Sequence, residues 1–363
     1  MKKLLKPIIF TTLACAFLLG AGISTEAASR IAINNDNFSA ALLSAAQEAD
    51  KNGDGYLSKK EVSSVENIQF RSYMKEDPFK GLEYFTDLKD FTYTSDFSEE
   101  LSWEDIKNDT STEHILNLSE FKKLESVDIL CYSLYLKEID LGGCSNLKEA
   151  NIDGRGNIDK LNLRGCTNLK VLKCYDLGIT KLNLSGLKKL SEVHVVIVNG
   201  GNKLPGKLKT LNLNKCSNLT SVYLLSDTLT NLKIKGADKL REIDCKYTQM
   251  TSLNLSDKKN LRKVNCEDNP NLTALDVSGC RQLRRLKCRN TRISRLNVKK
   301  NPDLKWLFCD NTEIKKLNLK NNKKLKKIDC RDTNIRNLNL PKTLKGKTKV
   351  KCGKEVPVTY KIK

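Results

Sequence analysis

The sequence predicts a mostly β solenoid with about 21 residues per coil, preceded by a small α-helical segment. Leucines recur at a nearly constant interval between residues 124 and 345, and each interval contains a second, shorter Leu-x-Leu segment. Upstream of these leucines, apolar residues follow the three- and four-residue spacing of amphipathic helices. A chain that repeats one unit many times stacks its coils into an elongated body, because each unit buries its apolar face only against its neighbours.

The interval between repeats is regular. The first leucines of successive units are separated by 23, 22, 21, 29, 21, 21, 22, 21 and 21 residues, and they lie at Leu124, Leu147, Leu169, Leu190, Leu219, Leu240, Leu261, Leu283, Leu304 and Leu325. The single interval of 29 residues contains Asn199-Gly200-Gly201-Asn202, which is typical of an inserted loop.

Each unit repeats the same order of inward positions. In residues 283–303 these positions are Leu283, Leu286, Cys288, Thr291, Ile293, Leu296, Val298 and Asn301. The order matches the L-x-x-L-x-L-x-x-N-x-L frame of leucine-rich repeats, with cysteine in the third apolar position and threonine in place of the usual asparagine. It predicts two short strands per coil, stacked about 4.8 Å from one coil to the next.

The N-terminus has the pattern of a secretory signal peptide. Lysines at positions 2, 3 and 6 precede an apolar run from Pro7 to Ile23, and small residues at Thr25 and Ala27 fit a cleavage site before Ala28. No later stretch has the roughly 18 apolar residues of a membrane helix. We therefore expect a secreted, extracellular chain without a transmembrane segment, held at the cell surface, if at all, by charge.

One calcium loop is predicted in the helical segment. Asp50, Asn52, Asp54, Gly55 and Glu61 fit the EF-hand pattern D-x-[DN]-x-[DN]-G-x5-E at every position. The four polar side chains would supply oxygens to the ion, and Gly55 would permit the sharp turn. The alternative is a polar turn that binds no metal.

The surroundings of this loop set its expected affinity. Tyr56 would add a backbone carbonyl, and apolar stripes predict a helix on each side, the second through Val62, Val65 and Ile68. Because EF-hands normally pair and this chain has one, we expect a weak, structural calcium ion with a Kd of about 10⁻⁴ to 10⁻³ M.

The order of these modules resembles that of exported EF-hand and leucine-rich-repeat proteins of Gram-positive, often gut-dwelling, bacteria, which are similar to internalins in general plan. The resemblance rests on the calcium loop, the cap-like Gly81-Leu82-Glu83-Tyr84-Phe85-Thr86-Asp87-Leu88 and the L-x-x-L-x-C repeats. It implies binding to other macromolecules. Residues 92–120 depart from the repeat frame, and no wall-anchoring module follows the repeats.

These patterns divide the chain into five parts. We expect a signal peptide at 1–27, a helical segment with the calcium loop at 28–80, and an N-terminal cap with irregular first repeats at 81–123. The regular solenoid follows at 124–345, and a basic C-terminal cap or tail at 346–363.

Twelve cysteines follow the predicted signal peptide. An even number in an exported chain is compatible with disulfide bonds. Their positions favour buried, reduced thiols instead, because one group recurs at the same inward position of successive units: Cys245, Cys266, Cys288, Cys309 and Cys330. Zinc is disfavoured because the chain has no C-x-x-C pair and two histidines.

The net charge of +21 is divided unevenly along the chain. Residues 30–120 contain 9 Lys and Arg against 19 Asp and Glu, whereas residues 203–363 contain 40 against 14. A basic body favours an anionic partner outside the cell, such as a charged glycan or an acidic protein surface, and secretion argues against a specific nucleic-acid partner. The alternative role of the charge is solubility.

Residues that alternate with the inward positions of each first strand should face solvent in columns. Among them, Trp306 and Phe308 flanked by cations form the most unusual patch, and exposed aromatics beside cations are typical of recognition sites. The predicted ligand-binding residues are Trp306, Phe308, Arg285, Lys287, Arg289, Lys327, Arg331 and Tyr223. Alternatively, a terminal loop within 341–363 folds over the two rings.

No pattern of catalytic residues stands out. His114 and His194 are the two histidines of the chain, and no phosphate-binding loop or dinucleotide fingerprint is present. We therefore expect a monomeric binding or adhesion module that is not an enzyme. A structural surface protein without a specific ligand is the second hypothesis, and an enzyme with an unrecognised carboxylate site is the third.

Overall fold

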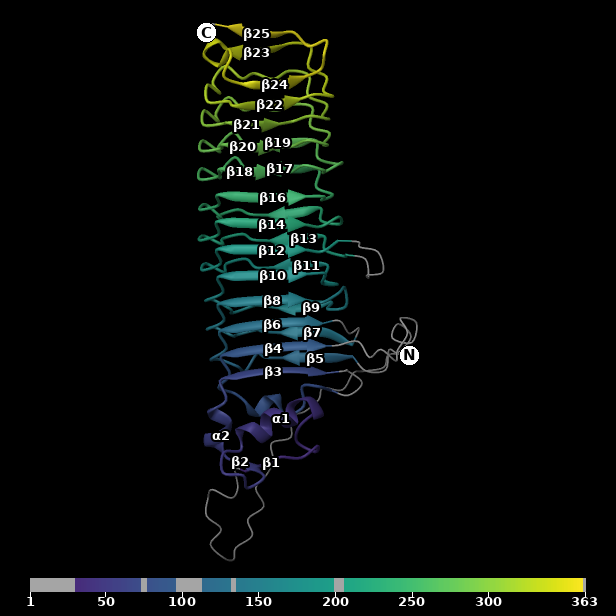
Figure 1. Ribbon diagram of the computed structural model, residues 1–363, viewed down its shortest axis with the longest axis vertical. Coiled ribbons are helices and arrows are strands. Elements are labelled where there is room, and N and C mark those ends of the chain that lie inside the picture. The colour runs from purple at the N-terminus through teal and green to yellow at the C-terminus, as the bar shows by residue number, and fades with distance from the viewer. Residues whose placement is uncertain (1–29, 73–76, 96–112, 132–134, 199–205, 362–363) are drawn as a thin grey trace, which may run out of the picture.

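The computed structural model describes residues 30–72, 77–95, 113–131, 135–198 and 206–361. These residues form a parallel β-solenoid of about 12 turns of roughly 22 residues, which confirms the predicted fold class. The coils are stacked along one long axis, with the helical segment at one end and β25 at the other (Figure 1). The predicted signal peptide and the inserted loop at 199–202 lie outside the described residues.

One continuous sheet covers one side of the solenoid. Within the described residues it has thirteen strands, all paired in parallel: β3 (Asn67–Ser72), β4 (Asp90–Ser95), β6 (Ser126–Cys131), β8 (Glu149–Asp153), β10 (Val171–Tyr175), β12 (Glu192–Val196), β14 (Ser221–Leu225), β16 (Glu242–Lys246), β18 (Lys263–Asn265), β20 (Arg285–Lys287), β21 (Trp306–Phe308), β22 (Lys327–Cys330) and β24 (Lys349–Cys352). We call the outer side of this sheet the strand face.

The other side carries short strands that run in the opposite direction (Figure 1). They form separate small sheets: β5 (His114–Asn117), β7 (Leu136–Asp140) and β9 (Lys160–Asn162); β11 (Lys181–Asn183), β13 (Thr210–Asn212) and β15 (Asn231–Lys233); β17 (Ser252–Asn254) and β19 (Ala274–Asp276); β23 (Leu338–Pro341) and β25 (Val358–Lys361). The second Leu-x-Leu segment therefore supplies the second strand in most coils. The prediction of two strands per coil is wrong at residues 296–298, which form no strand, and at 317–319, where only Asn318 bridges to Asn339.

Side chains of both strands meet in one core between the two sides. Along the large sheet, Leu286, Leu307 and Ile328 pair in register, and each is fully buried. In each strand the two residues that flank this buried residue remain partly exposed, except Asp329, which is buried. This period-two alternation follows from the pleat of a strand and explains why the repeat frame could be recognised in the sequence.

A second buried position joins several coils to the one before. Near the turn after the second strand, the thiol of Cys280 donates to Leu255 O at 3.2 Å, and the amide of Asn301 donates to Val277 O at 2.9 Å. Asn322 makes the equivalent bond to Val298 O at 3.0 Å. The same position is occupied by cysteine at 144, 166 and 216, and each cysteine or asparagine there supplies a buried donor to a carbonyl of the preceding coil. Leucine, alanine and lysine stand there at 187, 237 and 258.

The helical segment closes the N-terminal end of the stack. It comprises β1 (Ile31–Ala32), α1 (Ala40–Ala49), β2 (Tyr56–Leu57), α2 (Lys59–Ser63) and the 3-10 helix η2 (Leu82–Tyr84). Ser39 caps α1 by accepting from Leu42 N, and the buried face of this helix includes Leu42 and Ala46. Buried rings of Phe38, Phe70, Phe79, Phe85 and Phe91 lie between this segment and the first coils, so the open end of the core is covered.

The predicted helix through Val62, Val65 and Ile68 is wrong beyond its first turn. The helix α2 ends at Ser63, where the Ser64 hydroxyl donates to Glu61 O at 2.7 Å. Ile68 lies instead in β3, where it is buried together with Phe70. A serine that bonds to the backbone of the last turn competes with further helix, and the edge of β4 offers a full set of strand partners.

Both ends of the solenoid extend past the range in which the leucine frame is regular. Parallel pairing begins at β3, within the expected helical part, because Ile68, Phe91 and Val127 occupy the inward positions without the leucine spacing. At the other end, η3 (Lys342–Leu344) lies at the end of the expected solenoid, and the expected cap or tail forms β24 and β25, which continue both sides of the stack. The described residues contain no helix long and apolar enough to span a bilayer.

The cysteines of the described residues are free thiols, twelve in number, and all are buried except the partly exposed Cys352. Burial raises the pKa of the Cys288 thiol to about 12 and that of Cys144 to about 11. A thiol with so high a pKa stays protonated near neutral pH and reacts slowly, because the thiolate is the nucleophile.

The buried donor near the second strand should be measurable in stability. Replacing Asn301 with Ala removes two side-chain hydrogen bonds, to Val277 O and Cys280 O, which keep only their backbone donors. At about 0.5–1.5 kcal/mol for each bond, the free energy of unfolding should fall by about 1–3 kcal/mol in urea titrations. Asn301→Cys should lose less, since Cys280 donates from the same position in the preceding unit. Equal losses in the two variants would contradict the assigned role of the donor.

Thiol titration tests the arrangement of the cysteines. A water-soluble thiol reagent should label Cys352 rapidly in the native protein and the buried thiols only after denaturation. In Cys352→Ala the rapid phase should disappear. A denatured, unreduced sample with fewer reactive thiols than the reduced sample would instead demonstrate disulfide bonds.

Candidate functional site

The predicted calcium loop connects α1 to α2 and is folded by its own side chains. Asp50 accepts from Gly53 N at 2.8 Å and from Gly55 N at 3.0 Å, and Asn52 Oδ1 accepts from Asp54 N at 2.9 Å. Gly53 and Gly55 have φ of 72° and 78°, a left-handed conformation in which glycine avoids the strain of a side chain. The loop is therefore held in a tight turn, in which the side-chain oxygens of Asp50 and Asn52 accept hydrogen bonds from backbone N–H groups of the loop itself.

The strand of this loop has a partner within the same segment. Tyr56 and Leu57 pair in an antiparallel manner with Ala32 and Ile31, and Ile33 N donates to Gly55 O at 3.0 Å. This pairing stabilises the loop from within its own segment.

Two of the predicted ligands already have strong partners. Asp54 Oδ2 lies 3.0 Å from the guanidinium of Arg30, and Glu61 Oε2 accepts from Ser58 N at 2.9 Å in the capping box of α2. Hydrogen bonds from the Ser58 backbone and hydroxyl lower the pKa of Glu61, which keeps it ionised. Within the described part of the chain, no group of three or more His, Cys, Asp or Glu side chains converges as a metal site does. Calcium binding at Asp50, Asn52, Asp54, Tyr56 and Glu61 remains a prediction, in which the ion would replace Arg30 at Asp54.

The predicted ligand-binding residues lie on the strand face. Trp306 and Phe308 are half-buried on either side of the buried Leu307. The Arg285 guanidinium lies 4.9 Å from the centre of the Trp306 ring, and Phe308 has Arg289 at 5.3 Å and Lys327 at 5.0 Å. Each ring is therefore in cation–π contact with a neighbouring coil. We call the two rings and the three cations that contact them the aromatic patch: Trp306, Phe308, Arg285, Arg289 and Lys327.

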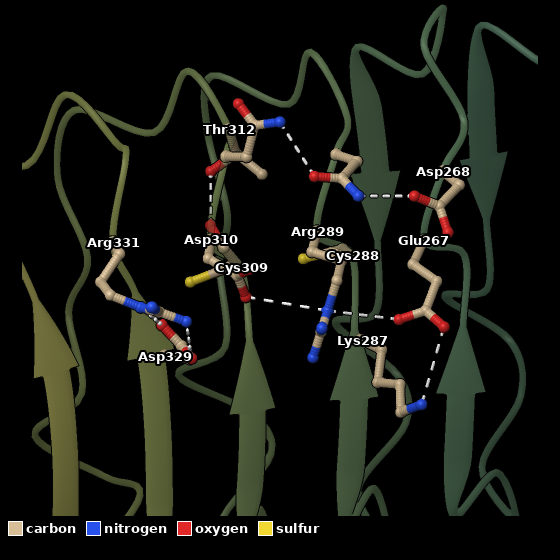
Figure 2. Close-up of polar contacts among 12 residues, drawn as sticks. Glu267, Asp268, Lys287, Cys288, Arg289, Cys309, Asp310, Thr312, Asp329 and Arg331 are labelled. Carbon is tan, nitrogen blue, oxygen red and sulfur yellow. Dashed lines mark hydrogen bonds and ion pairs between the residues drawn. The ribbon is translucent and has the colours of Figure 1, made fainter.

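Carboxylates on the same face hold several of the cations in place, as Figure 2 shows. Arg289 Nε lies 3.3 Å from Glu267 and 3.8 Å from Asp310, and Lys287 Nζ lies 3.7 Å from Glu267. The positions of these charges follow from the parallel register, which sets equivalent residues of successive coils side by side. The strand face near β20 and β21 thus has mixed charge and an ordered arrangement of side chains.

Arg331 is bound to its own strand. Its guanidinium contacts both carboxylate oxygens of Asp329, at 2.8 and 2.9 Å (Figure 2). Burial raises the pKa of Asp329, but the bonds from Arg331 outweigh it, so the pKa lies below the ordinary value. Arg331 therefore neutralises a buried carboxylate at the edge of the patch.

The structure separates one predicted residue from the others. Tyr223 lies on β14, and β16, β18 and β20 stand between it and β21. Its ring packs beside His194, with the ring centroids 5.7 Å apart. Tyr223 belongs to the strand face but lies four strands from Trp306, or about 19 Å at the usual strand spacing.

The C-terminal segment does not cover the two rings. β24 pairs edge to edge with β22, with Lys349 beside Lys327 and Lys351 beside Asp329. The segment adds one more strand to the sheet, next to β22. The groups that partly cover Trp306 and Phe308 are cations of adjacent strands, such as Arg285 and Lys327. The alternative that residues 341–363 fold over the patch is therefore wrong for the described residues up to 361.

A basic groove on the opposite side of the solenoid escaped the sequence analysis. It lies over the last second strands, around β23, and is lined mainly by lysine and asparagine. The local signal was the density of Lys and Asn between residues 315 and 323. The predicted exposed columns belong to the first strands alone, so these lysines enter the prediction only through the overall net charge.

The fold resembles that of solved leucine-rich-repeat proteins. An internalin from Listeria monocytogenes is 17% identical, with a TM-score of 0.56 over 92% of this chain and 94% of the internalin. The functional domain of InlJ from the same bacterium is 20% identical, with a TM-score of 0.41 over 87% of this chain and 78% of that domain. No protein-family model matches the chain, and no curated protein matches it. At this identity the likeness to the internalin concerns the fold.

Calorimetric titration with calcium tests the loop. We expect a Kd of about 10⁻⁴ to 10⁻³ M for the wild type and a rise in thermal midpoint at saturating calcium. Glu61→Gln keeps the acceptor that caps α2 but loses the charge, so both responses should disappear. Glu66→Gln, which changes a carboxylate paired with Lys89 outside the loop, is the matched control. A wild type that shows neither heat nor stabilisation contradicts the predicted site.

Proposed function

We propose that the chain is a secreted, non-catalytic binding module whose strand face recognises another macromolecule. The observation that carries the proposal is the aromatic patch, in which two half-buried rings are ordered by cations, Trp306 by Arg285 and Phe308 by Arg289 and Lys327. Rings held in place in this manner lose little conformational entropy on binding, and tryptophan and arginine dominate the energetics of protein interfaces.

The chemistry of the patch favours an acidic protein surface as partner. Arg285 and Lys327 contact rings, and neither forms an ion pair with a described carboxylate, whereas Arg289 is divided between two carboxylates. A partner carboxylate could therefore pair with Arg285 or Lys327 while apolar atoms cover the rings. The internalin-like fold supports a binding role, since such solenoids present a long, rigid surface.

Export and calcium belong to the same proposal. The signal-peptide pattern places the strand face outside the cell, where millimolar calcium concentrations suit a loop of weak affinity. The calcium loop supports the segment that closes the N-terminal end of the core, far from β21 in the stack. Calcium therefore acts on the stability of the rod and not on recognition.

Selection from a random-peptide phage library, followed by calorimetry on the enriched peptides, tests the proposal. Peptides that combine acidic and apolar residues should be enriched, and Trp306→Ala/Phe308→Ala should weaken their binding at least about tenfold, or about 1.4 kcal/mol. Tyr247→Ser removes a more exposed ring, 50% accessible, from a turn outside the strand, and should bind like the wild type.

The same variants separate recognition from a purely structural role. The thermal midpoint of Trp306→Ala/Phe308→Ala should change little, because both rings lie outside the core between the two sides. A large fall in the midpoint without any enriched peptide would favour the structural scaffold. Enrichment of the same peptides on the double variant would show that the patch is not the recognition surface.

A further inference from the structure

The basic groove has a composition unlike the rest of the solenoid. Its volume is about 1520 Å³, larger than the pockets that hold single small ligands. Four lysines on the coil before β23 line one side, at Lys315, Lys316, Lys320 and Lys323. Arg336 and Lys342 from the next coil and Lys361 of β25 complete the cationic lining.

These charges are not neutralised within the described chain. The groove lining includes no Asp or Glu, and none of its seven cations forms an ion pair with a described residue. The strand face differs in this respect, because Glu267, Asp310 and Asp329 interleave with its cations. Like charges gathered on successive coils repel one another and disfavour folding, so an external anion would stabilise the groove.

Asparagine side chains add neutral donors between the cations. Asn318 and Asn339 form a parallel bridge, and Asn321, Asn334 and Asn337 also line the groove. The amides of Asn321 and Asn339 donate to Lys299 O at 3.0 Å and to Asn337 Oδ1 at 3.3 Å. The side-chain Oδ1 of Asn318 accepts from Lys320 N at 3.2 Å, so its amide nitrogen is a donor without an acceptor in the described chain, like those of Asn334 and Asn337. Amide donors beside lysines match an oxyanion that accepts several hydrogen bonds.

The groove runs across coils rather than along one. Asn318 pairs with Asn339 and Asn339 with Thr359, so equivalent positions recur from coil to coil at the strand spacing of about 4.8 Å. Leu317, Leu340 and Pro341 also line the groove but are largely buried, so the methylene chains of the lysines supply much of the accessible apolar surface. A linear chain that carries charges at intervals and apolar C–H faces between them fits this arrangement.

The lining also discriminates against two other classes of anion. It contains no aromatic ring, so the bases of a single-stranded nucleic acid would find no surface on which to stack. β23 has β25 on one side and the bridge to Asn318 on the other, so an acidic peptide could add a strand only at the outer edge of β25, which contributes Lys361 alone to the lining.

From these observations we propose that the groove around β23 binds a linear glycan that carries sulfate or phosphate groups. The site lies on the side opposite the strand face and does not depend on the aromatic patch. Tetrahedral oxyanions of the glycan contact the lysines and Arg336, and its sugar rings lie against the apolar atoms between them. Release of counterions from the seven cations and the glycan drives association.

Heparin is the first probe, measured by calorimetry with the full chain at about 0.15 M salt. The groove variant Lys315→Gln/Lys316→Gln/Lys320→Gln should lose at least about tenfold in affinity. Its slope of log K against log salt should fall by about three, or about one for each lysine removed. Heparin should raise the thermal midpoint of the wild type more than that of this variant.

A matched variant controls for net charge. Lys181→Gln/Lys188→Gln/Lys209→Gln removes three exposed lysines from the same side of the solenoid, around β11 and β13 and outside the groove. It should bind heparin within about twofold of the wild type. If both triple variants lose affinity equally, or if the wild type binds neither heparin nor a phosphorylated mannan at this salt concentration, the proposal is overturned.

Other polyanions identify the class of ligand. A linear mannan that carries phosphate groups tests phosphate as the source of the oxyanion, and groove-dependent binding of either this phosphorylated mannan or heparin supports the proposal. Single-stranded DNA and poly-glutamate of matched charge should bind at least about tenfold more weakly, and equal affinity for either would contradict a glycan site. Trp306→Ala/Phe308→Ala should bind heparin normally, so failure of the groove and failure of the strand face give different results.

Discussion

The stacking of each coil on the next is the constraint on which the whole structure depends. A single coil exposes the backbone edges of its strands and one side of its inward side chains, so it cannot be stable by itself. The neighbouring coil satisfies both requirements at once: strands such as β20 and β21 pair in parallel, and Leu286 packs against Leu307. The inter-coil bonds of Cys280 and Asn301 add buried donors at the opposite side of the same core.

Stacking also leaves the core to be covered at the two ends of the described stack. At the N-terminal end the helical segment and its buried phenylalanines cover the core. At the C-terminal end β24 is the last strand of the large sheet, and it carries Lys349 and Lys351. Lysines on an edge strand discourage pairing with a second molecule. The helical segment therefore stabilises the solenoid by covering its core, and the lysines of β24 disfavour edge-to-edge association with a second molecule.

Because the strands pair in parallel register, equivalent residues of successive coils lie side by side in columns along the solenoid. The side chains in a column determine what that part of the surface can bind. On the strand face, opposite charges alternate between coils at Glu267, Arg289 and Asp310, and the cations are shared with the two rings. Around β23 the columns contain lysine and asparagine without carboxylates. The same repeat thus produces an ordered surface of mixed charge on one side and a cationic groove on the other.

The sequence by itself determined the architecture, because burial at a fixed interval leaves a periodic record: the leucines, the inward cysteines and the alternating exposure of Trp306, Leu307 and Phe308 could all be inferred from spacing. Contacts between coils were decided only by the tertiary structure. Residues about 21 positions apart become neighbours through the register of the strands, and this register brought Arg285 over Trp306, placed Tyr223 apart from both, and gathered Lys315 and Lys361 around one groove. The register also explains why Ile68 lies in β3 and not in the expected helix: the edge of β4 offers backbone partners, and local helix propensity does not reveal them.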